Sequence, residues 1–534
     1  MRPHKLESMN KRTLLGTVAA IAALGLVLTG CVPERDQVSP SDTPSTASTT
    51  DPSASAVTPG GTASPANPGD SRVYDQQLAW SPCDELECST VQVPVDWSNP
   101  DGPTFGVAIN RHVALDSDER LGSMLINPGG PGGEGLSFAE YFVSIAGDDL
   151  LDAYDVIGFD PRGVGQSSGV NCGDGAALDA YYLPDVVLNT QADVDAAREN
   201  FIDFTNNCRE LTGPVWENVD TVSAARDMDV IRSVLGDEQL NFLGYSYGTE
   251  LGATYAELYP TNVGRMTLDG AVDFLLDDTQ LSVDQASGFE LALSNFIEWC
   301  HTQEECLLDS DTATAKQQIH DMTVTAQDVG YPSGNDMDVN GTLMFYGIAV
   351  TLYDQTSWPY LMNGLNEVLR DRTASVIFQL ANFYLDRDPS SGNYSSNSTE
   401  AFTAIGCMDA PLEDPYTIEE YNDFADSVIA AAPTLGFAYA AGTGCDGWQW
   451  EANEYIENLD ATSATGPILV VGTTNDPATP IKWARSLTDR LGNASLLEWD
   501  GEGHTAYGRS NQCVIDAVDG YMVDGTMPSS GKQC

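Results

Sequence analysis

Basic residues are scarce in this sequence. Its 534 residues include 23 Lys and Arg against 79 Asp and Glu, which gives a formal net charge of −56 at pH 7. Beyond the first 30 residues the lysines are Lys316, Lys482 and Lys532. Proteins that bind nucleic acids neutralise phosphates with clusters of Lys and Arg. Because the chain has no such cluster, we expect no nucleic-acid partner. The acidic excess itself fits either a salt-tolerant surface, whose self-repulsion salt would screen, or an ordinary acidic exported protein.

Histidines and closely spaced cysteine pairs are also few. Beyond residue 30 the histidines are His112, His301, His320 and His504, and no two cysteines stand in a C-x-x-C pattern. Zinc sites are commonly built from such pairs. No Gly-Lys-Ser or Gly-Lys-Thr follows a glycine-rich loop, which argues against a phosphate-binding loop. We therefore expect neither a metal nor a cofactor.

The N-terminal apolar run is short. It covers residues 14–28, follows a basic stretch and ends in Leu-Thr-Gly before Cys31. A membrane-spanning helix needs about 20 apolar residues. This stretch resembles a bacterial lipoprotein signal, which implies a cleaved signal peptide over residues 1–30 and a lipid on Cys31. The protein would then be exported and anchored to the outer face of the cell membrane through that lipid alone, or released from there. The alternative is a plain secretory signal in which Cys31 is incidental.

The next segment, residues 31–71, is rich in Ser, Thr and Pro and nearly free of aliphatic residues. It cannot bury a core, so we expect a disordered tether. The sequence has 11 cysteines, and ten remain if Cys31 is lipidated. An even number in an exported protein suggests disulfides. Connectivity cannot be derived from sequence, and we expect sequential pairing of Cys83, Cys88, Cys172, Cys208, Cys300, Cys306, Cys407, Cys445, Cys513 and Cys534.

The most informative stretch is residues 240–249, an apolar run that leads into Gly244-Tyr245-Ser246-Tyr247-Gly248. Residues 250–259 then have apolar positions at helical spacing and stop at Pro260. A serine between a strand and a helix, flanked by glycines, is typical of a nucleophile elbow. A second G-x-S-x-G, centred on Ser167, has neither a strand directly before it nor a clear helix after it. Context therefore favours Ser246 as the nucleophile.

A glycine-rich loop follows another apolar run. Residues 123–126 are followed by Asn-Pro-Gly-Gly-Pro-Gly-Gly-Glu-Gly over residues 127–135. In acyl-transfer hydrolases of this kind, oxyanion-hole N–H groups come from such a loop and from the residue after the nucleophile. We assign them to Gly130 and Tyr247, and a merely flexible loop is the alternative. The buried run 154–160 leads into Pro-Arg-Gly-Val-Gly, where Asp160 and Arg162 are expected to brace the oxyanion loop without reacting.

Two further strand ends supply the remaining catalytic candidates. The apolar run 467–472 leads to Asp476, and residues 495–499 lead to His504. Serine, acid and histidine follow one another in this order in α/β-hydrolases. We therefore predict a triad of Ser246, Asp476 and His504. Strands that alternate with helices also predict a mostly parallel sheet covered on both faces.

Five motifs together identify a family. G-G-P-G-G, G-F-D-P-R-G-V-G, G-Y-S-Y-G, D-P-A-T-P and the late G-H resemble the prolyl iminopeptidase and tripeptidyl aminopeptidase family of serine peptidases, in its exported actinobacterial lipoprotein form. The resemblance implies an α/β-hydrolase core over residues 72–273 and 466–534 with a large, mainly helical cap over residues 274–465. Asn127-Pro128 stands where iminopeptidases have a histidine before the glycines, which favours the tripeptidyl branch.

The same resemblance suggests a function. Cap carboxylates in the family hold the free ammonium of the substrate, and Asp409 is the candidate here, with a solvated surface aspartate as the alternative. We expect a monomeric serine aminopeptidase that releases short peptides, tripeptides in particular, from peptide or protein substrates with free N-termini. A carboxylester hydrolase on the same fold is the first alternative, because a triad serves both reactions. A non-catalytic, peptide-binding lipoprotein is the second.

Overall fold

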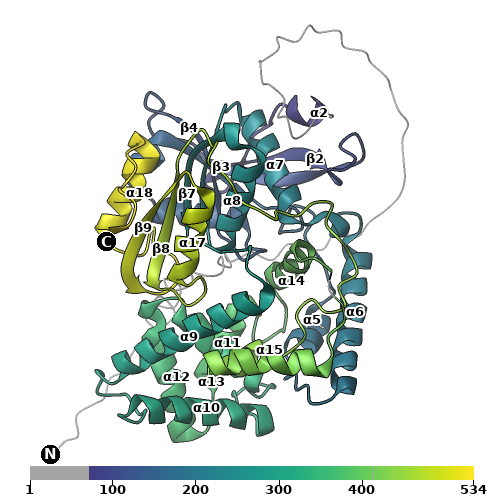
Figure 1. Cartoon of the computed structure of the whole chain (residues 1–534), viewed down its shortest axis with the longest axis vertical. Coiled ribbons are helices and arrows are strands. Elements are labelled where there is room, and N and C mark those ends of the chain that lie inside the picture. Colours follow the sequence, from purple (N-terminus) through teal and green to yellow (C-terminus); the bar gives the residue numbers. More distant parts are fainter. Residues whose placement is uncertain (1–70, 413) are drawn as a thin grey trace, which may run out of the picture.

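The computed structural model describes residues 71–412 and 414–534 (Figure 1). The predicted signal peptide, Cys31 and nearly all of the tether lie outside the described residues. Within those residues the centre of the molecule is one sheet of ten strands, in the order β1-β2-β3-β5-β4-β6-β7-β8-β9-β10. The strands are β1 (Ser81–Cys83), β2 (Leu86–Pro94), β3 (Thr104–His112), β4 (Gly122–Asn127), β5 (Tyr154–Phe159), β6 (Leu240–Tyr245), β7 (Val263–Asp269), β8 (Ile468–Asn475), β9 (Ala494–Glu502) and β10 (Lys532–Gln533).

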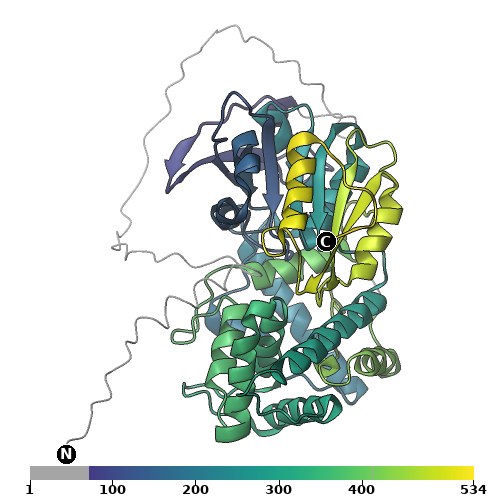
Figure 2. The same ribbon diagram turned by 90° about the vertical axis from the view of Figure 1, so that its left-hand side faces the viewer.

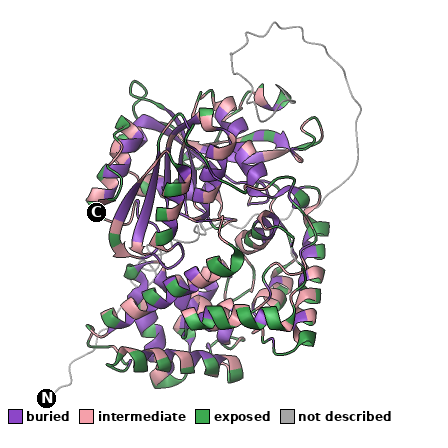
Figure 3. Cartoon of the chain, in the orientation of Figure 1, coloured by how far each residue is buried: buried purple, intermediate pink, exposed green. Residues whose placement is uncertain are grey.

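The sheet is parallel from β5 to β10, and β1, β2 and β3 extend it in antiparallel fashion. Every residue of β4 and β5 is buried, as expected for central parallel strands that are covered on both faces. Figure 3 shows this burial across the strands, whereas the outer faces of the surrounding helices are exposed.

Helices cover both faces of the sheet. On one face α7 (Thr221–Leu235), α8 (Tyr247–Leu258) and α17 (Ile481–Leu491) contribute to one apolar cluster. On the other face α3 (Gly135–Ile145), α4 (Asp148–Ala153) and α18 (Gln512–Asp524) contribute to a second. This is the predicted α/β-hydrolase fold.

A helical region lies at the end of the sheet where the parallel strands finish (Figures 1 and 2). It has its own apolar core, built around Phe296, Trp358 and Leu361. Its helices are α9 (Asp278–Cys300), α10 (Thr312–Val329), α11 (Gly341–Leu352), α12 (Trp358–Asp371), α13 (Ser375–Tyr384), α14 (Ser398–Asp409), α15 (Ile418–Ala431) and α16 (Gly436–Tyr439). The short segment η4 (Gln355–Ser357) lies between α11 and α12, and the short helical segments elsewhere are α2 (Ser71–Tyr74), η2 (Trp216–Asn218) and η3 (Pro260–Asn262). We call the region from α9 to α16 the cap.

Two earlier helices pack with the cap, although their sequence lies within the predicted first part of the core. They are α5 (Gly175–Tyr182) and α6 (Gln191–Thr212). Asp179 of α5 forms an ion pair of 2.6 Å with Arg387, and Arg198 of α6 donates to the backbone oxygen of Tyr416 at 2.8 Å. The division of the folded chain into a core over residues 72–273 and 466–534 and a cap over residues 274–465 stays a prediction. Through these contacts α5 and α6 add two helices to the helical region that contains the cap.

Among the described residues, five disulfides join cysteines that are sequential neighbours, which confirms the predicted pairing. They are Cys83–Cys88, Cys172–Cys208, Cys300–Cys306, Cys407–Cys445 and Cys513–Cys534. None of the helices in residues 71–412 and 414–534 combines the length and the apolar character needed to cross a membrane.

Candidate active site

Ser246 lies at the sharp turn between β6 and α8. Its backbone has φ 55° and ψ −122°, a conformation that is strained for a residue with a side chain. A Cβ atom on Gly244 would lie 2.4 Å from the oxygen of Gly248, and one on Gly248 would lie 2.8 Å from Oδ1 of Asn127. Both flanking positions must therefore be glycine for the turn to close. This is the strand, turn and helix that a nucleophile elbow requires.

The second G-x-S-x-G motif has a different environment. Ser167 is fully buried, and its Oγ accepts a hydrogen bond of 2.9 Å from the N–H of Ala108 in β3. Neither a strand directly before it nor a helix directly after it forms an elbow. Ser167 is thus a structural residue that satisfies a backbone donor.

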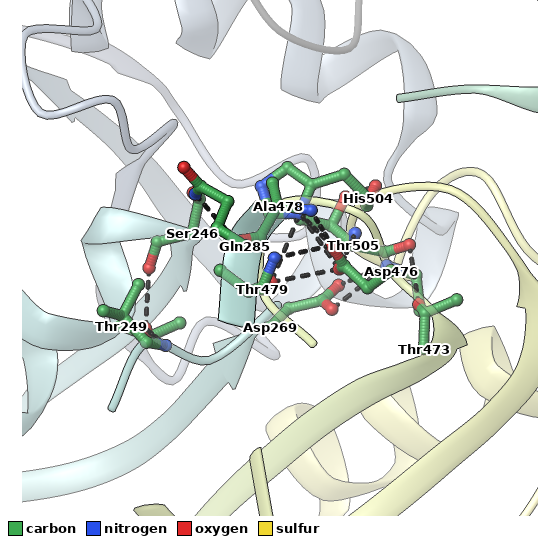
Figure 4. Close-up of polar contacts among 12 residues, drawn as sticks. Ser246, Thr249, Asp269, Gln285, Thr473, Asp476, Ala478, Thr479, His504 and Thr505 are labelled. Atoms are coloured by element: carbon green, nitrogen blue, oxygen red, sulfur yellow. Dashed lines mark hydrogen bonds and ion pairs between the residues drawn. The ribbon is translucent and has the colours of Figure 1, made fainter. Parts of the chain in front are cut away.

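Asp476 and His504 are paired beyond the ends of β8 and β9 (Figure 4). Nδ1 of His504 lies 2.9 Å from each carboxylate oxygen of Asp476. The carboxylate also accepts backbone N–H groups from Ala478 at 2.9 Å, Thr479 at 2.8 Å and Thr505 at 3.1 Å. This pairing favours the imidazole tautomer with hydrogen on Nδ1, which leaves Nε2 free to accept a proton.

Ser246 and the His504 loop are held by one residue at the end of β7. The backbone oxygen of Asp269 accepts the N–H of Ser246 at 2.9 Å. Its carboxylate accepts the N–H groups of Ala506 and Tyr507. For the described residues, no hydrogen bond is formed between the Ser246 hydroxyl and His504. Such contacts are often long in ligand-free hydrolases and tighten when substrate binds.

The other predicted histidines are elsewhere. His112 is the last residue of β3, His301 follows α9 with Nε2 2.7 Å from the backbone oxygen of Asp309, and His320 lies within α10. None of them belongs to the elements that carry Ser246 and Asp476.

The glycine-rich loop passes directly over the elbow. A Cβ atom on Gly129 would lie 2.8 Å from Cβ of Ser246 and 3.2 Å from the nitrogen of Tyr247. Among the loop and turn hydrogen bonds of the described residues, neither Gly130 N–H nor Tyr247 N–H donates to a backbone oxygen. Tyr247 is also the first residue of α8, where the helix dipole favours negative charge. The structure thus places Gly129 of this loop beside Ser246 and Tyr247, and Gly130 is the next residue along the loop. The role of Gly130 and Tyr247 as oxyanion donors stays a prediction.

Asp160 braces the oxyanion loop as predicted, but Arg162 does not. The carboxylate of Asp160 accepts the N–H of Leu136 at 3.1 Å, in the helix that follows the loop, and that of Gln166 at 2.9 Å. Burial raises the pKa of Asp160 to about 6. Arg162 is structural, as expected, but its contacts lie elsewhere. It forms a fully buried ion pair of 2.7 Å with Asp227 and donates to the backbone oxygens of Pro94, at the end of β2, and Val95. It therefore joins that segment to α7, and its predicted role at the oxyanion loop is wrong.

Asp409 lies at the end of α14, close to the residue that follows the nucleophile. Its carboxylate accepts the backbone N–H of Thr221 at 2.7 Å and the hydroxyl of Thr221 at 2.6 Å. The same hydroxyl oxygen lies 2.5 Å from the Tyr247 hydroxyl. Asp409 is half-buried rather than freely solvated, and burial raises its pKa to about 7.

Two further carboxylates accompany Asp409, and the sequence analysis missed both. Glu250 lies one turn of α8 after Ser246, and burial together with the charge of Asp409 raises its pKa well above the usual value. Asp220 is 2% exposed; one of its oxygens caps α7 through Ser223, and Oδ2 has no partner among the described residues. The spacing of four residues from Ser246 could have indicated Glu250. We call Asp220, Glu250 and Asp409 the acidic cluster.

The three carboxyl groups of the acidic cluster influence one another's ionisation. Burial raises the pKa of Asp409, and the negative charge of Asp220 raises that pKa further. Burial also raises the pKa of Glu250, and the negative charge of Asp409 adds to this shift. Across residues 71–412 and 414–534, no group of His, Cys, Asp and Glu side chains has the arrangement of a metal site. The acidic cluster therefore gathers three carboxyl groups near the residue that follows the nucleophile.

The cap touches the histidine directly. The backbone oxygen of Tyr353, at the end of α11, accepts the N–H of His504 at 2.9 Å. The Tyr353 ring stands edge-on to the imidazole at 5.5 Å, and Phe289 and Tyr384 pack around Tyr353. The cap thus contributes an aromatic wall next to the catalytic candidates.

The fold and this site define an α/β-hydrolase with a serine nucleophile elbow. Residues 432–534 match the family described as TAP-like protein. The chain is 32% identical over 547 residues to serine protease Hip1 of Mycobacterium tuberculosis, which covers 97% of this chain and 96% of that protein. It is 33% identical over 484 residues to carboxylesterase B of the same organism, which covers 86% of this chain and 91% of that protein. It is 29% identical over 463 residues to tripeptidyl aminopeptidase of Streptomyces lividans, which covers 85% of this chain and 84% of that protein.

The chain therefore belongs to the tripeptidyl-aminopeptidase-like family of serine peptidases on the α/β-hydrolase fold, and the protein is a serine hydrolase. This confirms the family that the five sequence motifs indicated.

Proposed function

We propose that the protein is an aminopeptidase that releases short peptides, tripeptides in particular, from the free N-termini of peptides and proteins. The observation that carries this proposal is the acidic cluster, which is joined through Thr221 to Tyr247, the residue after the nucleophile. A fixed negative charge close to the reacting serine selects for a substrate with an unblocked ammonium group.

In the proposed reaction Ser246 Oγ attacks the carbonyl carbon of the scissile peptide bond while Nε2 of His504 takes the hydroxyl proton. Asp476 holds the imidazole and stabilises its protonated form. The N–H groups of Gly130 and Tyr247 stabilise the negative oxygen of the tetrahedral intermediate. The C–N bond then breaks, His504 gives its proton to the leaving amine, and water releases the acyl group from Ser246 by the same steps.

The position of the acidic cluster supports a short released peptide. An extended tripeptide spans about 10 Å. The path from Ser246 to Asp409 consists of the Tyr247 side chain and two hydrogen bonds of 2.5 and 2.6 Å. The acidic cluster is thus joined to the residue after the nucleophile by a short chain of contacts, which supports release of a short peptide.

The decisive assay uses tripeptidyl anilides with free and with acetylated N-termini on the purified full-length protein. We expect cleavage of the free form, at least tenfold slower cleavage of the acetylated form, and no activity for Ser246→Ala. Asp409→Asn and Glu250→Gln should both lower turnover of the free form. Asp423→Asn, an exposed change on α15, is the matched control that should leave turnover unchanged. Equal cleavage of the free and acetylated forms would contradict the proposal.

A carboxylester hydrolase is the second candidate, because a relative of the chain bears the name carboxylesterase B. Short acyl esters lack an ammonium group, so their hydrolysis does not need the acidic cluster. If esters are hydrolysed and both forms of the peptide are inert, the second candidate replaces the first. A fluorophosphonate probe that fails to label Ser246 would instead favour a non-catalytic binding protein.

We also propose that the protein is exported as a monomer and held at the outer face of the cell membrane by a lipid on Cys31, from which it can be released. The Leu-Thr-Gly-Cys ending of the N-terminal apolar run supports this. Growth with a radioactive fatty acid should label the wild-type protein and leave Cys31→Ala unlabelled. Label on neither protein would contradict anchoring.

A further inference from the structure

Asp269 is a buried carboxylate that the proposed reaction does not use. It is the last residue of β7 and is 0% exposed. In the sheet it lies between Tyr245 of β6, next to the nucleophile, and Val471 of β8, the strand that leads to Asp476. Its position between the two strands places it beneath the catalytic candidates.

The main chain and side chain of Asp269 hold two different parts of the site. The backbone oxygen accepts the N–H of Ser246 at 2.9 Å. Each carboxylate oxygen lies 3.0 Å from the nitrogen of Ala506, and Oδ2 lies 2.7 Å from that of Tyr507. Both of those N–H groups belong to the loop that follows His504, so one residue connects the nucleophile to the base.

The loop between His504 and Ala506 needs such a connection. Thr505 has φ 66°, the left-handed region that a β-branched residue rarely adopts. Its backbone oxygen accepts the hydroxyl of Thr473 at 3.1 Å. At Gly270, directly after Asp269, a Cβ atom would lie 3.2 Å from Cε1 of His504. The imidazole therefore packs on the end of β7 over a strained turn, and the carboxylate of Asp269 offsets that strain.

The charged surroundings of Asp269 are limited. The basic side chains that face Asp269 are those of His504 and Arg509. Its acidic neighbour is Asp476, and the phenol groups near it are those of Tyr245 and Tyr507. Burial raises the pKa of Asp269 to about 6, against the lowering effect of the backbone N–H groups. The hydrogen bonds to its side chain come from backbone N–H groups, so the carboxylate is suited to fixing a loop.

We propose that Asp269 is a positioning residue whose carboxylate holds the His504 loop against the strand end that carries the nucleophile, and so sets the distance between the base and Ser246. This inference rests on the proposed roles of Ser246 and His504. It does not depend on which peptide or ester is the substrate.

The test is the rate of labelling of Ser246 by a fluorophosphonate probe in the full-length protein, compared with peptide turnover. Labelling needs the serine–histidine pair but no peptide substrate, so a wrong assignment of substrate leaves this test intact. We expect Asp269→Asn to lower the labelling rate constant and kcat by about 10- to 100-fold, with KM unchanged, since displacement of a catalytic group by about 1 Å costs this much.

The fraction of sites that label at saturation separates positioning from folding. If Asp269 positions His504, every molecule still labels, but slowly. If Asp269 only stabilises the fold, fewer molecules label, each at the wild-type rate, and the proposal is overturned. Asp155→Asn is the matched control: Asp155 is buried and accepts the N–H of Ala114 at 2.9 Å, but it lies at the opposite end of β5, away from the site. It should label at the wild-type rate.

A measurement on the wild-type protein covers the case in which Asp269→Asn does not fold. Hydrogen exchange should show the N–H groups of Ala506 and Tyr507 protected to the level of neighbouring strand β7, although both lie in a loop. Exchange at the rate of an exposed loop would mean that the carboxylate does not hold them, which also overturns the proposal.

Discussion

Asp409→Asn tests how the acidic cluster recognises the substrate. If Asp409 binds the free ammonium, replacing its carboxylate with a neutral amide removes one partner of a partly buried charge pair. Such losses cost about 2–5 kcal/mol, and the lower end applies because Glu250 remains. We therefore expect kcat/KM for a free tripeptidyl anilide to fall by about 30- to 100-fold at pH 7.5, since each 1.36 kcal/mol is a factor of ten.

The pH dependence of this step follows from the pKa of Asp409, which burial raises to about 7. Below that pH the carboxyl is protonated and neutral, so it must lose its proton before it binds an ammonium. Each pH unit below 7 should then lower kcat/KM about tenfold through this group. Above about pH 8 the substrate amine itself becomes neutral. The preference for a free N-terminus should therefore be greatest between about pH 7 and 8.

The assay must separate Asp409 from the catalytic pair, whose own ionisation also affects turnover. The rate of fluorophosphonate labelling reports the Ser246 and His504 pair without the ammonium site, so the ratio of kcat/KM to that rate isolates the acidic cluster. In the wild type this ratio should fall as the pH drops below 7. In the Asp409→Asn variant this ratio should be lower than in the wild type and should not change with pH. A ratio that falls equally in both proteins would refute the assignment of Asp409.

Three further outcomes are expected. Gly129→Ala places a Cβ atom 2.5 Å from the oxygen of Tyr245 and 2.8 Å from Cβ of Ser246, so kcat should fall by about 100-fold or more, and unchanged steady-state kinetics would contradict the close approach of the loop. Arg162→Met leaves the buried carboxylate of Asp227 unpaired and should lower the free energy of unfolding by about 3–5 kcal/mol in urea titrations at pH 7. With a net charge of −56, the melting temperature should rise between about 0.05 and 1 M NaCl, and a flat response would argue against salt tolerance.

Local patterns in the sequence were enough to predict the parallel strands and the elbow at Ser246, and the family resemblance of five motifs implied the α/β-hydrolase fold. Continuous apolar runs such as residues 467–472 indicate strands buried on both faces, and the glycines around Ser246 are required by backbone contacts within a few residues. The order of Ser246, Asp476 and His504 led to residues that the structure places at one edge of the sheet, because parallel strands all end there.

The remaining features depend on contacts between distant parts of the chain, which no local pattern reports. Asp409 meets Thr221 across 188 positions, and Arg162 meets Asp227 across 65. The packing of α5 and α6 with the cap likewise rests on contacts between residues far apart in sequence. Asp220 caps α7 through one oxygen, which is a local role, whereas its second oxygen has no partner among the described residues and lies near Asp409 only through the fold.

The most direct test of the central claim is mass spectrometry of the first products released from a hexapeptide with a free N-terminus. The account predicts that the intact N-terminal tripeptide appears first, that its acetylated counterpart is spared, and that Ser246→Ala releases nothing. Early cleavage at internal bonds irrespective of the N-terminus would contradict it, because the acidic cluster would then have no part in choosing the bond that is cut.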